Sequence, residues 1–233
     1  MNTVPLTIRG MHYFMVMNSD HQYLTYSYLS LRKAVGWIGI LLPFVLMFGG
    51  HLIFKEKLIL KNISLYYHTG MRDVYVGSLC AIALFLFFYR GYDKWDNRAG
   101  NTAGFLAILI VFFPTVESGP YNLSAWIHLF AAGSFFLILS WMSLFRFTRQ
   151  ANHPTRQKVK RNRIYVLCGI TMGVSMVAIL IFLIFFDKSH PHSGFVFWLE
   201  TLILLAFGTS WLTKGGTLYP DKVTQAQYQT KRP

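Results

Sequence analysis

Six long apolar segments divide the chain, and short polar links separate them. The segments are 34–54, 74–89, 102–116, 123–145, 164–186 and 194–213. A helix needs about 20 residues to cross the roughly 30 Å of hydrocarbon in a bilayer, so the second and third segments would borrow polar neighbours. Runs such as CAIALFLFF and MVAILIFLIFF lack the apolar–polar alternation of membrane barrel strands. The pattern predicts an all-helical (all-α) polytopic membrane protein with six transmembrane helices in one bundle.

The composition agrees with a lipid environment. Of the 233 residues, 54% are hydrophobic and only 13% are charged, whereas soluble domains carry about 25% charged residues. We therefore expect one transmembrane domain over 34–213, preceded by an amino-terminal segment at 1–33 and followed by a tail at 214–233.

The basic residues predict the orientation of this domain. With six spans both termini face the same side, and 17 of the 22 Lys and Arg residues would lie there. The other five, on the opposite side, are Lys55, Lys57, Lys61, Arg72 and Lys188. Cytoplasmic loops carry the excess of Lys and Arg, so both termini should be cytoplasmic. We expect a bacterial-type cytoplasmic (inner) membrane.

Two polar links on the predicted cytoplasmic side need no nucleic acid to explain them. The basic run TRQKVKRNR (155–163) directly precedes a span, where such clusters contact anionic lipid head groups and set topology. The link YRGYDKWDNRAGN (89–101) mixes both charge signs, and we expect local ion pairs within that turn. The predicted partners are membrane lipids rather than nucleic acid.

Ionisable residues within the apolar segments are the candidates for chemistry, because lipid disfavours them unless they face a bundle interior. Glu200 (in FWLETLILL) and His128 (in SAWIHLFAAG) lie near the outer ends of their spans, and Asp73 begins the second span. Gly77 follows Asp73 at helical spacing, so a small-residue stripe would turn the carboxylate inward. We predict an outward-opening polar pocket formed by Asp73, His128 and Glu200.

The stretch NISLYYHTGMRD (62–73) would cover this pocket. Tyr67, His68 and Arg72 are predicted to form its lid, with the guanidinium of Arg72 binding a phosphate or carboxylate. The occupant would be a lipid or small amphiphile.

Two other interpretations stay open. His128, Glu200, Asp73 and His68 are candidate zinc ligands for an intramembrane lipid hydrolase, although no H-x-x-x-H or H-E-x-x-H pair occurs. Alternatively, the same side chains only secure packing, and the chain is an accessory subunit bound to another membrane protein or to a second copy of itself.

The predicted six spans, with Ile63 and Ser64 in the first outer loop, Arg72 at the mouth of the second span and Trp198 with Glu200 in the last, resemble a known superfamily. It includes the damage-regulated autophagy modulators, the GPI-anchor lipid-remodelling factor and uncharacterised bacterial relatives. Those relatives tend to have proline before the loop arginine, where this chain reads HTGMRD. The resemblance implies a role on or among membrane lipids and points to Ser64, Arg72 and Glu200.

Overall fold

The computed structural model is all-helical over the residues it describes, which are 6–149, 155–190 and 193–220, with side chains from Leu29 onward. The α-helices are α1 (Leu6–Phe54), α2 (Arg72–Phe88), α3 (Lys94–Phe112), α4 (Leu123–Trp141), α5 (Arg156–Phe185) and α6 (Phe195–Lys214). A short 3-10 helix, η1 (Ile63–His68), precedes α2, and a π-helical turn, η2 (Met142–Arg146), continues α4. The predicted tail at 214–233 lies mostly outside the described residues.

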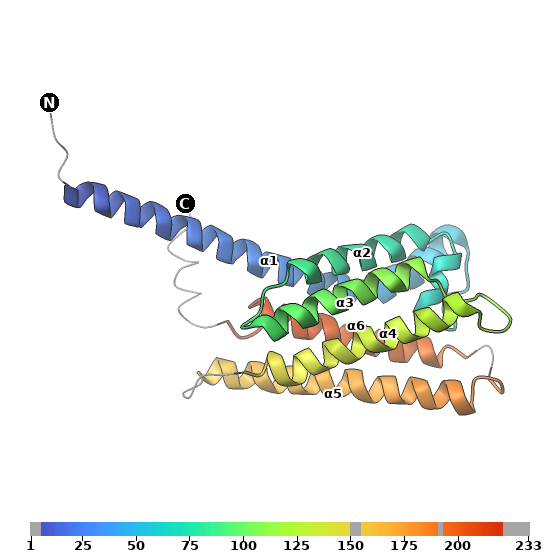
Figure 1. The fold of residues 1–233 in the computed structure, drawn as a ribbon. Helices are drawn as coiled ribbons and strands as arrows, with labels where there is room; N and C mark the ends of the chain where they lie inside the picture. Colours follow the sequence, from blue (N-terminus) through green and yellow to red (C-terminus); the bar gives the residue numbers. More distant parts are fainter. Residues whose placement is uncertain (1–5, 150–154, 191–192, 221–233) are drawn as a thin grey trace.

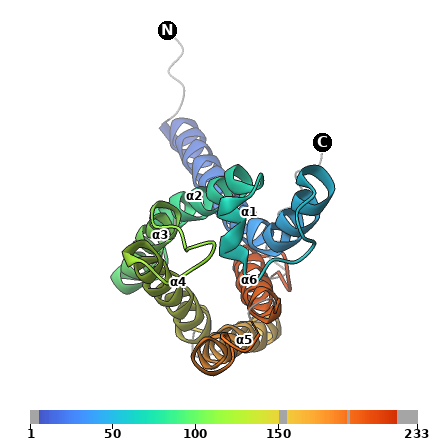
Figure 2. The same ribbon diagram turned by 90° about the vertical axis from the view of Figure 1, so that its right-hand side faces the viewer.

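The six α-helices form a ring in chain order. Each packs against the next, and α6 closes the ring by packing along α1 (Figures 1 and 2). The helix η1 contacts α1, α2 and α6 at one end of the ring. We call this the η1 end, and we call the other, where α3 begins, the α3 end. Because α4 barely touches α6, side chains must fill the middle of the ring.

Among the residues that the structure describes, four helical segments are long and apolar enough to cross a membrane, judged by length and composition. They are Leu29–Phe54, Leu123–Arg146, Arg156–Phe185 and Phe195–Lys214. These four segments support the predicted integral membrane protein, and the six-span bundle stays a prediction. Helix α2 has only 17 residues, and α3 begins with the polar stretch KWDNR.

Exposed apolar side chains cover the outside of the ring. Helix α5 shows this most clearly, with Leu167 67% exposed and Phe185 71% exposed. The further exposed apolar residues of α5 include Val166, Ile170, Val174, Val177, Leu180, Ile181 and Ile184. A soluble monomer rarely exposes so continuous an apolar face. Such a face is typical of a helix in contact with the lipid acyl chains of a bilayer.

Both ends of the third predicted span and the start of the first differ from the helices in the structure. Helix α3 begins eight residues before the predicted 102, because the carboxylate of Asp93 caps it by accepting from the backbone N–H groups of Trp95 and Asp96. It ends at Phe112 because Phe113 precedes Pro114, and the residue before a proline avoids helical geometry. Pro114, predicted inside a span, therefore lies beyond the helix. Helix α1 also extends back to Leu6, so that its first part projects past the bundle (Figure 1).

Three glycines let α1 and α6 approach closely. A Cβ on Gly208 would lie 2.5 Å from the carbonyl oxygen of Gly36, and one on Gly39 would lie 2.7 Å from the Phe207 ring. Small residues at helix crossings are the usual means of close packing in membranes. This contact closes the ring.

Candidate functional site

The amino-terminal end of the helix η1 is capped by Asn62. The side-chain oxygen of Asn62 accepts a hydrogen bond from the backbone N–H of Leu65 at 3.0 Å. Ile63 and Tyr66 then turn into the core, where both are buried. The cap thus fixes the orientation of η1 over the end of the ring.

Helix α6 holds η1 in place through Glu200. A carboxylate oxygen of Glu200, in the second turn of α6, accepts a hydrogen bond from the backbone N–H of Ile63 at 2.5 Å. The backbone N–H of Phe197 also donates to the carbonyl oxygen of Lys61 at 3.0 Å. Glu200 therefore satisfies a backbone donor from a segment 137 residues away in sequence.

Helix α4 reaches the same short helix through His128, which is buried. Its Nε2 lies 2.8 Å from the hydroxyl of Ser64, and its Nδ1 lies 3.2 Å and 3.0 Å from the carbonyl oxygens of Ile110 and Phe113. Carbonyl oxygens only accept, so Nδ1 carries the proton and donates. In the neutral ring Nε2 then accepts from Ser64, so both ring nitrogens are occupied.

The ring encloses a cavity beneath η1. Its volume is about 50 Å³, which is room for roughly four water molecules. Ser64, Tyr75 and Glu200 supply its polar side chains. The rest of the lining is apolar and comes from Leu42, Ile63, Leu79, Ile82, Ile110, Ala132, Phe135, Phe136 and Leu204. The cavity is polar toward η1 and apolar toward the middle of the ring.

The structure brings two of the three predicted ionisable residues to η1 and leaves Asp73 apart, and only Glu200 of the three lines the cavity. Glu200 and His128 contact adjacent residues of η1, whereas Asp73 is exposed and does not line the cavity. Helix α2 buries Tyr75, Leu79, Ile82 and Leu86 at helical spacing, and this large apolar stripe fixes its inner face. Asp73 precedes Tyr75 by two residues, which is a rotation of about 200° around the helix. Asp73 therefore lies on the face opposite the buried Tyr75 and points outward.

The predicted lid residues lie beside the cavity instead of over it. A guanidinium nitrogen of Arg72 donates to the hydroxyl of Tyr67 at 2.7 Å, and its central carbon lies 4.4 Å from that ring's centroid. Nε2 of His68 lies 2.7 Å from the carbonyl oxygen of Thr115. None of the three lines the cavity. They form a separate cluster that ties η1 to α2 and to the loop after α3.

The candidate zinc ligands do not converge. Among the residues that the structure describes, no three His, Cys, Asp or Glu side chains lie close enough together to hold a metal ion. Asp73 and His68 are exposed and do not line the cavity, and both nitrogens of His128 are already hydrogen-bonded. The zinc hydrolase therefore gains no support from a ligand set.

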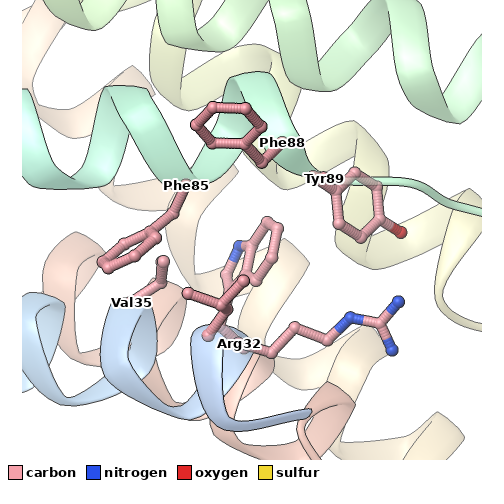
Figure 3. Close-up of a pocket in the computed structure, with 7 residues that line it drawn as sticks. Arg32, Val35, Phe85, Phe88 and Tyr89 are labelled. Atoms are coloured by element: carbon pink, nitrogen blue, oxygen red, sulfur yellow. The ribbon is translucent and has the colours of Figure 1, made fainter. Parts of the chain in front are cut away.

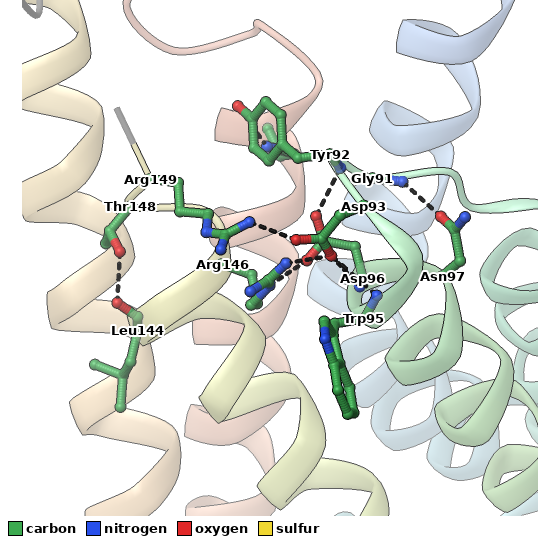
Figure 4. A network of polar contacts seen from close by, with 11 residues as sticks. Gly91, Tyr92, Asp93, Trp95, Asp96, Asn97, Leu144, Arg146, Thr148 and Arg149 are labelled. Atoms are coloured by element: carbon green, nitrogen blue, oxygen red, sulfur yellow. Dashed lines mark hydrogen bonds and ion pairs between the residues drawn. The ribbon is translucent and has the colours of Figure 1, made fainter. Parts of the chain in front are cut away.

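A second polar cluster lies at the α3 end, and the sequence did not predict it (Figure 4). The guanidinium of Arg146 binds the fully buried carboxylate of Asp96 through Nε and reaches Asp93 at 2.5 Å. Arg149 binds the other oxygen of Asp93 at 2.6 Å. Arg146 is the last residue of η2, and Arg149 follows it. Both lie 50 or more residues after the aspartates in sequence, so the expected local ion pairing within 89–101 was wrong.

The surroundings of Asp93 favour its charged form, and Asp96 is held by further hydrogen bonds. Hydrogen bonds from Arg146 and Arg149 lower the pKa of Asp93 well below its usual range. The second carboxylate oxygen of Asp96 accepts from the backbone N–H of Tyr92 at 2.6 Å. The π-helical turn η2 brings Arg146 round to this position. The cluster joins the α2–α3 turn to the end of α4.

No protein-family model, curated protein or solved structure matches the chain. The resemblance to six-helix lipid-associated proteins therefore stays a prediction, and function is argued from geometry.

Proposed function

We propose that all six helices span a cytoplasmic membrane, with the η1 end outward and both termini inside. Helices α2 and α3 run alongside the four segments that meet the length and composition of a span (Figure 1). The orientation is supported by the sequence, whose predicted links divide the 22 Lys and Arg residues into five on the outer side and 17 on the inner side.

We further propose that the cavity beneath η1 binds one end of a lipid or small amphiphile. The observation that carries this function is the cavity's polarity: Ser64, Tyr75 and Glu200 at one side, and apolar side chains elsewhere. Small-molecule sites have such a lining, with a few polar groups that fix orientation. At about 50 Å³, the cavity accepts one slender group, such as a chain end or a small polar head.

A structural role is the second candidate, and a specific observation favours it. Glu200 and His128 hydrogen-bond to η1 and to the end of α3, within the described part of the chain. These contacts would pin η1 over the ring whether or not a ligand is present. Interhelical hydrogen bonds in membrane proteins average about 0.6 kcal/mol each, so their loss alone should leave the fold intact.

The test is lipid retention by the purified protein. Glu200→Gln keeps an oxygen to accept from Ile63 but removes the charge, and Tyr75→Phe removes a polar atom of the cavity. Asp73→Asn is the matched control, since it changes an acid at the same end outside the cavity. We expect mass spectrometry to find a specific co-purified amphiphile in the wild type and in Asp73→Asn, reduced several-fold in the two cavity variants. Folded cavity variants with unchanged lipid would refute the ligand site and leave the structural role.

A further inference from the structure

Ser64 and His128 form a hydroxyl–imidazole pair, the Ser64–His128 dyad, at the polar side of the cavity beneath η1. Ser64 is partly buried and lines the cavity, whereas the buried His128 contacts it from outside the lining. The Ser64 hydroxyl lies 2.8 Å from Nε2 of His128. Because Nδ1 of the ring donates to carbonyl oxygens, Nε2 is the acceptor. A serine hydroxyl that donates to an imidazole is the arrangement of an activated nucleophile and its general base.

The sequence explains how the ring is held in this tautomer. In a continuing helix the carbonyl of Ile110 would accept from the backbone N–H four residues later, but that residue is Pro114, which has no N–H. The carbonyl oxygens of Ile110 and Phe113 instead accept from Nδ1 of His128, at 3.2 Å and 3.0 Å. In a serine–histidine–aspartate triad the carboxylate holds this second ring nitrogen. Here two neutral carbonyl groups hold it, which fixes the tautomer without adding charge.

A small space at the α3 end lacks this chemistry. It measures about 10 Å³ and lies between α1, α2 and α6, where Val35, Phe85 and Tyr89 belong to its lining (Figure 3). Of the described residues that line it, none is a serine, a histidine or an acid. Of these two spaces, the one beneath η1 is therefore the one that combines a nucleophile with a base.

We propose that Ser64 is the nucleophile, and His128 the general base, in the hydrolysis of a carboxylic ester of a membrane lipid. This inference rests on the proposed binding of an amphiphile in the cavity beneath η1. Ester groups join the polar and apolar parts of a lipid, and the cavity lining changes in the same way, from polar at Ser64 to apolar toward the middle of the ring. An acyl chain in the apolar part would bring its ester carbonyl to the polar side.

The reaction has two steps. Oγ of Ser64 attacks the ester carbonyl carbon while Nε2 of His128 takes the hydroxyl proton. The bond to the lipid alcohol then breaks, His128 returns the proton to the departing oxygen, and the acyl group stays on Ser64. Water, activated by the same ring nitrogen, attacks this acyl-enzyme, releases a fatty acid and restores the Ser64 hydroxyl. Tyr75 lines the same cavity, and its hydroxyl is a donor for the negative charge on the carbonyl oxygen.

The test uses the full-length protein, purified in detergent, and an alkyl fluorophosphonate, which phosphonylates an activated serine with loss of fluoride. Mass spectrometry of proteolytic peptides locates the label and follows its rate. His128→Gln keeps a hydrogen-bond donor and an acceptor but removes the base, so a merely structural histidine would be replaced without loss. Ser124→Ala and His51→Ala are the controls. Ser124 donates to the carbonyl oxygen of Pro114 at 2.8 Å, His51 is exposed, and neither lines the cavity.

We expect the label on Ser64 in the wild type and in both controls. Labelling of His128→Gln should be about a hundred-fold slower, the smaller end of what a general base contributes. In phosphatidylglycerol vesicles with isotope-labelled water, the wild type should release fatty acid that carries the isotope, and Ser64→Ala should release none.

An unlabelled Ser64 in the wild type, or equal rates in the wild type and His128→Gln, would overturn the Ser64–His128 dyad as a catalytic pair. If Glu200→Gln still loses its co-purified lipid in that case, the amphiphile site stands without the chemistry. Labelling of Ser64 with no release of fatty acid would overturn the lipid ester as the substrate.

Discussion

Asp96 is the residue on which the α3 end depends most. It is fully buried, and its ion pair with Arg146 is shielded from solvent by α3 and the end of α4. A buried pair adds little net stability compared with an apolar pair of equal volume, but removal of one partner leaves a buried charge uncompensated.

We therefore expect Asp96→Asn to lower the free energy of unfolding by about 1 to 3 kcal/mol, less than the loss of a whole buried ion pair, because Arg146 keeps Asp93 as a partner. Unfolding by SDS in mixed micelles, followed by tryptophan fluorescence, would measure the loss. Lys94→Gln, an exposed change two residues away, should have no effect. Replacing both partners by apolar residues, as Asp96→Leu with Arg146→Met, should recover much of the loss. An Asp96→Asn variant as stable as the wild type would contradict this account.

The sequence could assign single residues to a site only where an ionisable side chain would be unfavourable in contact with lipid and so must face the bundle interior. Glu200 and His128 interrupt long apolar runs, and both do turn into the bundle. Asp73 stands at a helix end, where lipid sets no such constraint, so the packing of Tyr75 and Leu79 decided its direction instead. The sequence did not predict Arg146 as the partner of Asp96, because basic residues within 89–101 were close enough in sequence to form the expected ion pairs. Only tertiary packing brings Arg146 to Asp96.

At the scale of the elements, the glycine contact between α1 and α6 makes a sharp prediction. Gly208→Ala places a methyl group against the Gly36 carbonyl, and forcing the helices apart should destabilise the protein by about 1 to 3 kcal/mol. Gly77→Ala is the control, because a Cβ there meets open space, and alanine favours a helix over glycine. Thermal unfolding in detergent would compare them. A Gly208→Ala variant as stable as Gly77→Ala would show that the contact is loose.

Apolar run length predicted the positions of most helices. The last predicted span, 194–213, differs from α6 by one residue at each end. The prediction failed where hydrogen bonding at a helix end outweighs hydropathy, as it does at the Asp93 cap, and where a basic helix continues beyond the lipid, as α5 does before residue 164. The helix η1 was not foreseen, because its stability comes from the Asn62 cap and from α6.

For the whole molecule, the proposal that the short helices α2 and α3 cross the membrane predicts a pattern of cysteine labelling. In a cysteine-free background made with Cys80→Ser and Cys168→Ser, single cysteines can be placed in three links through Lys57→Cys, Lys94→Cys and Ser118→Cys, all at exposed positions. We expect a membrane-impermeant maleimide to label the first and third in intact cells. The second should react only after permeabilisation.

The reverse labelling would invert the proposed orientation. Equal labelling of all three would mean that neither α2 nor α3 crosses, and the bundle would then hold four spans.

Closure of the ring by its first and last helices also has a consequence for biosynthesis. The surface of α1 around Gly36 packs against α6, which begins only at residue 195. At about 5 to 20 residues per second, the ribosome needs roughly 7 to 30 s to synthesise the chain between the end of α1 and the start of α6. During that interval the helix ring of the nascent protein is open, and a chain truncated before α6 cannot close it. Such fragments should be short-lived in the cell, since membrane proteases and insertases recognise unpaired helices.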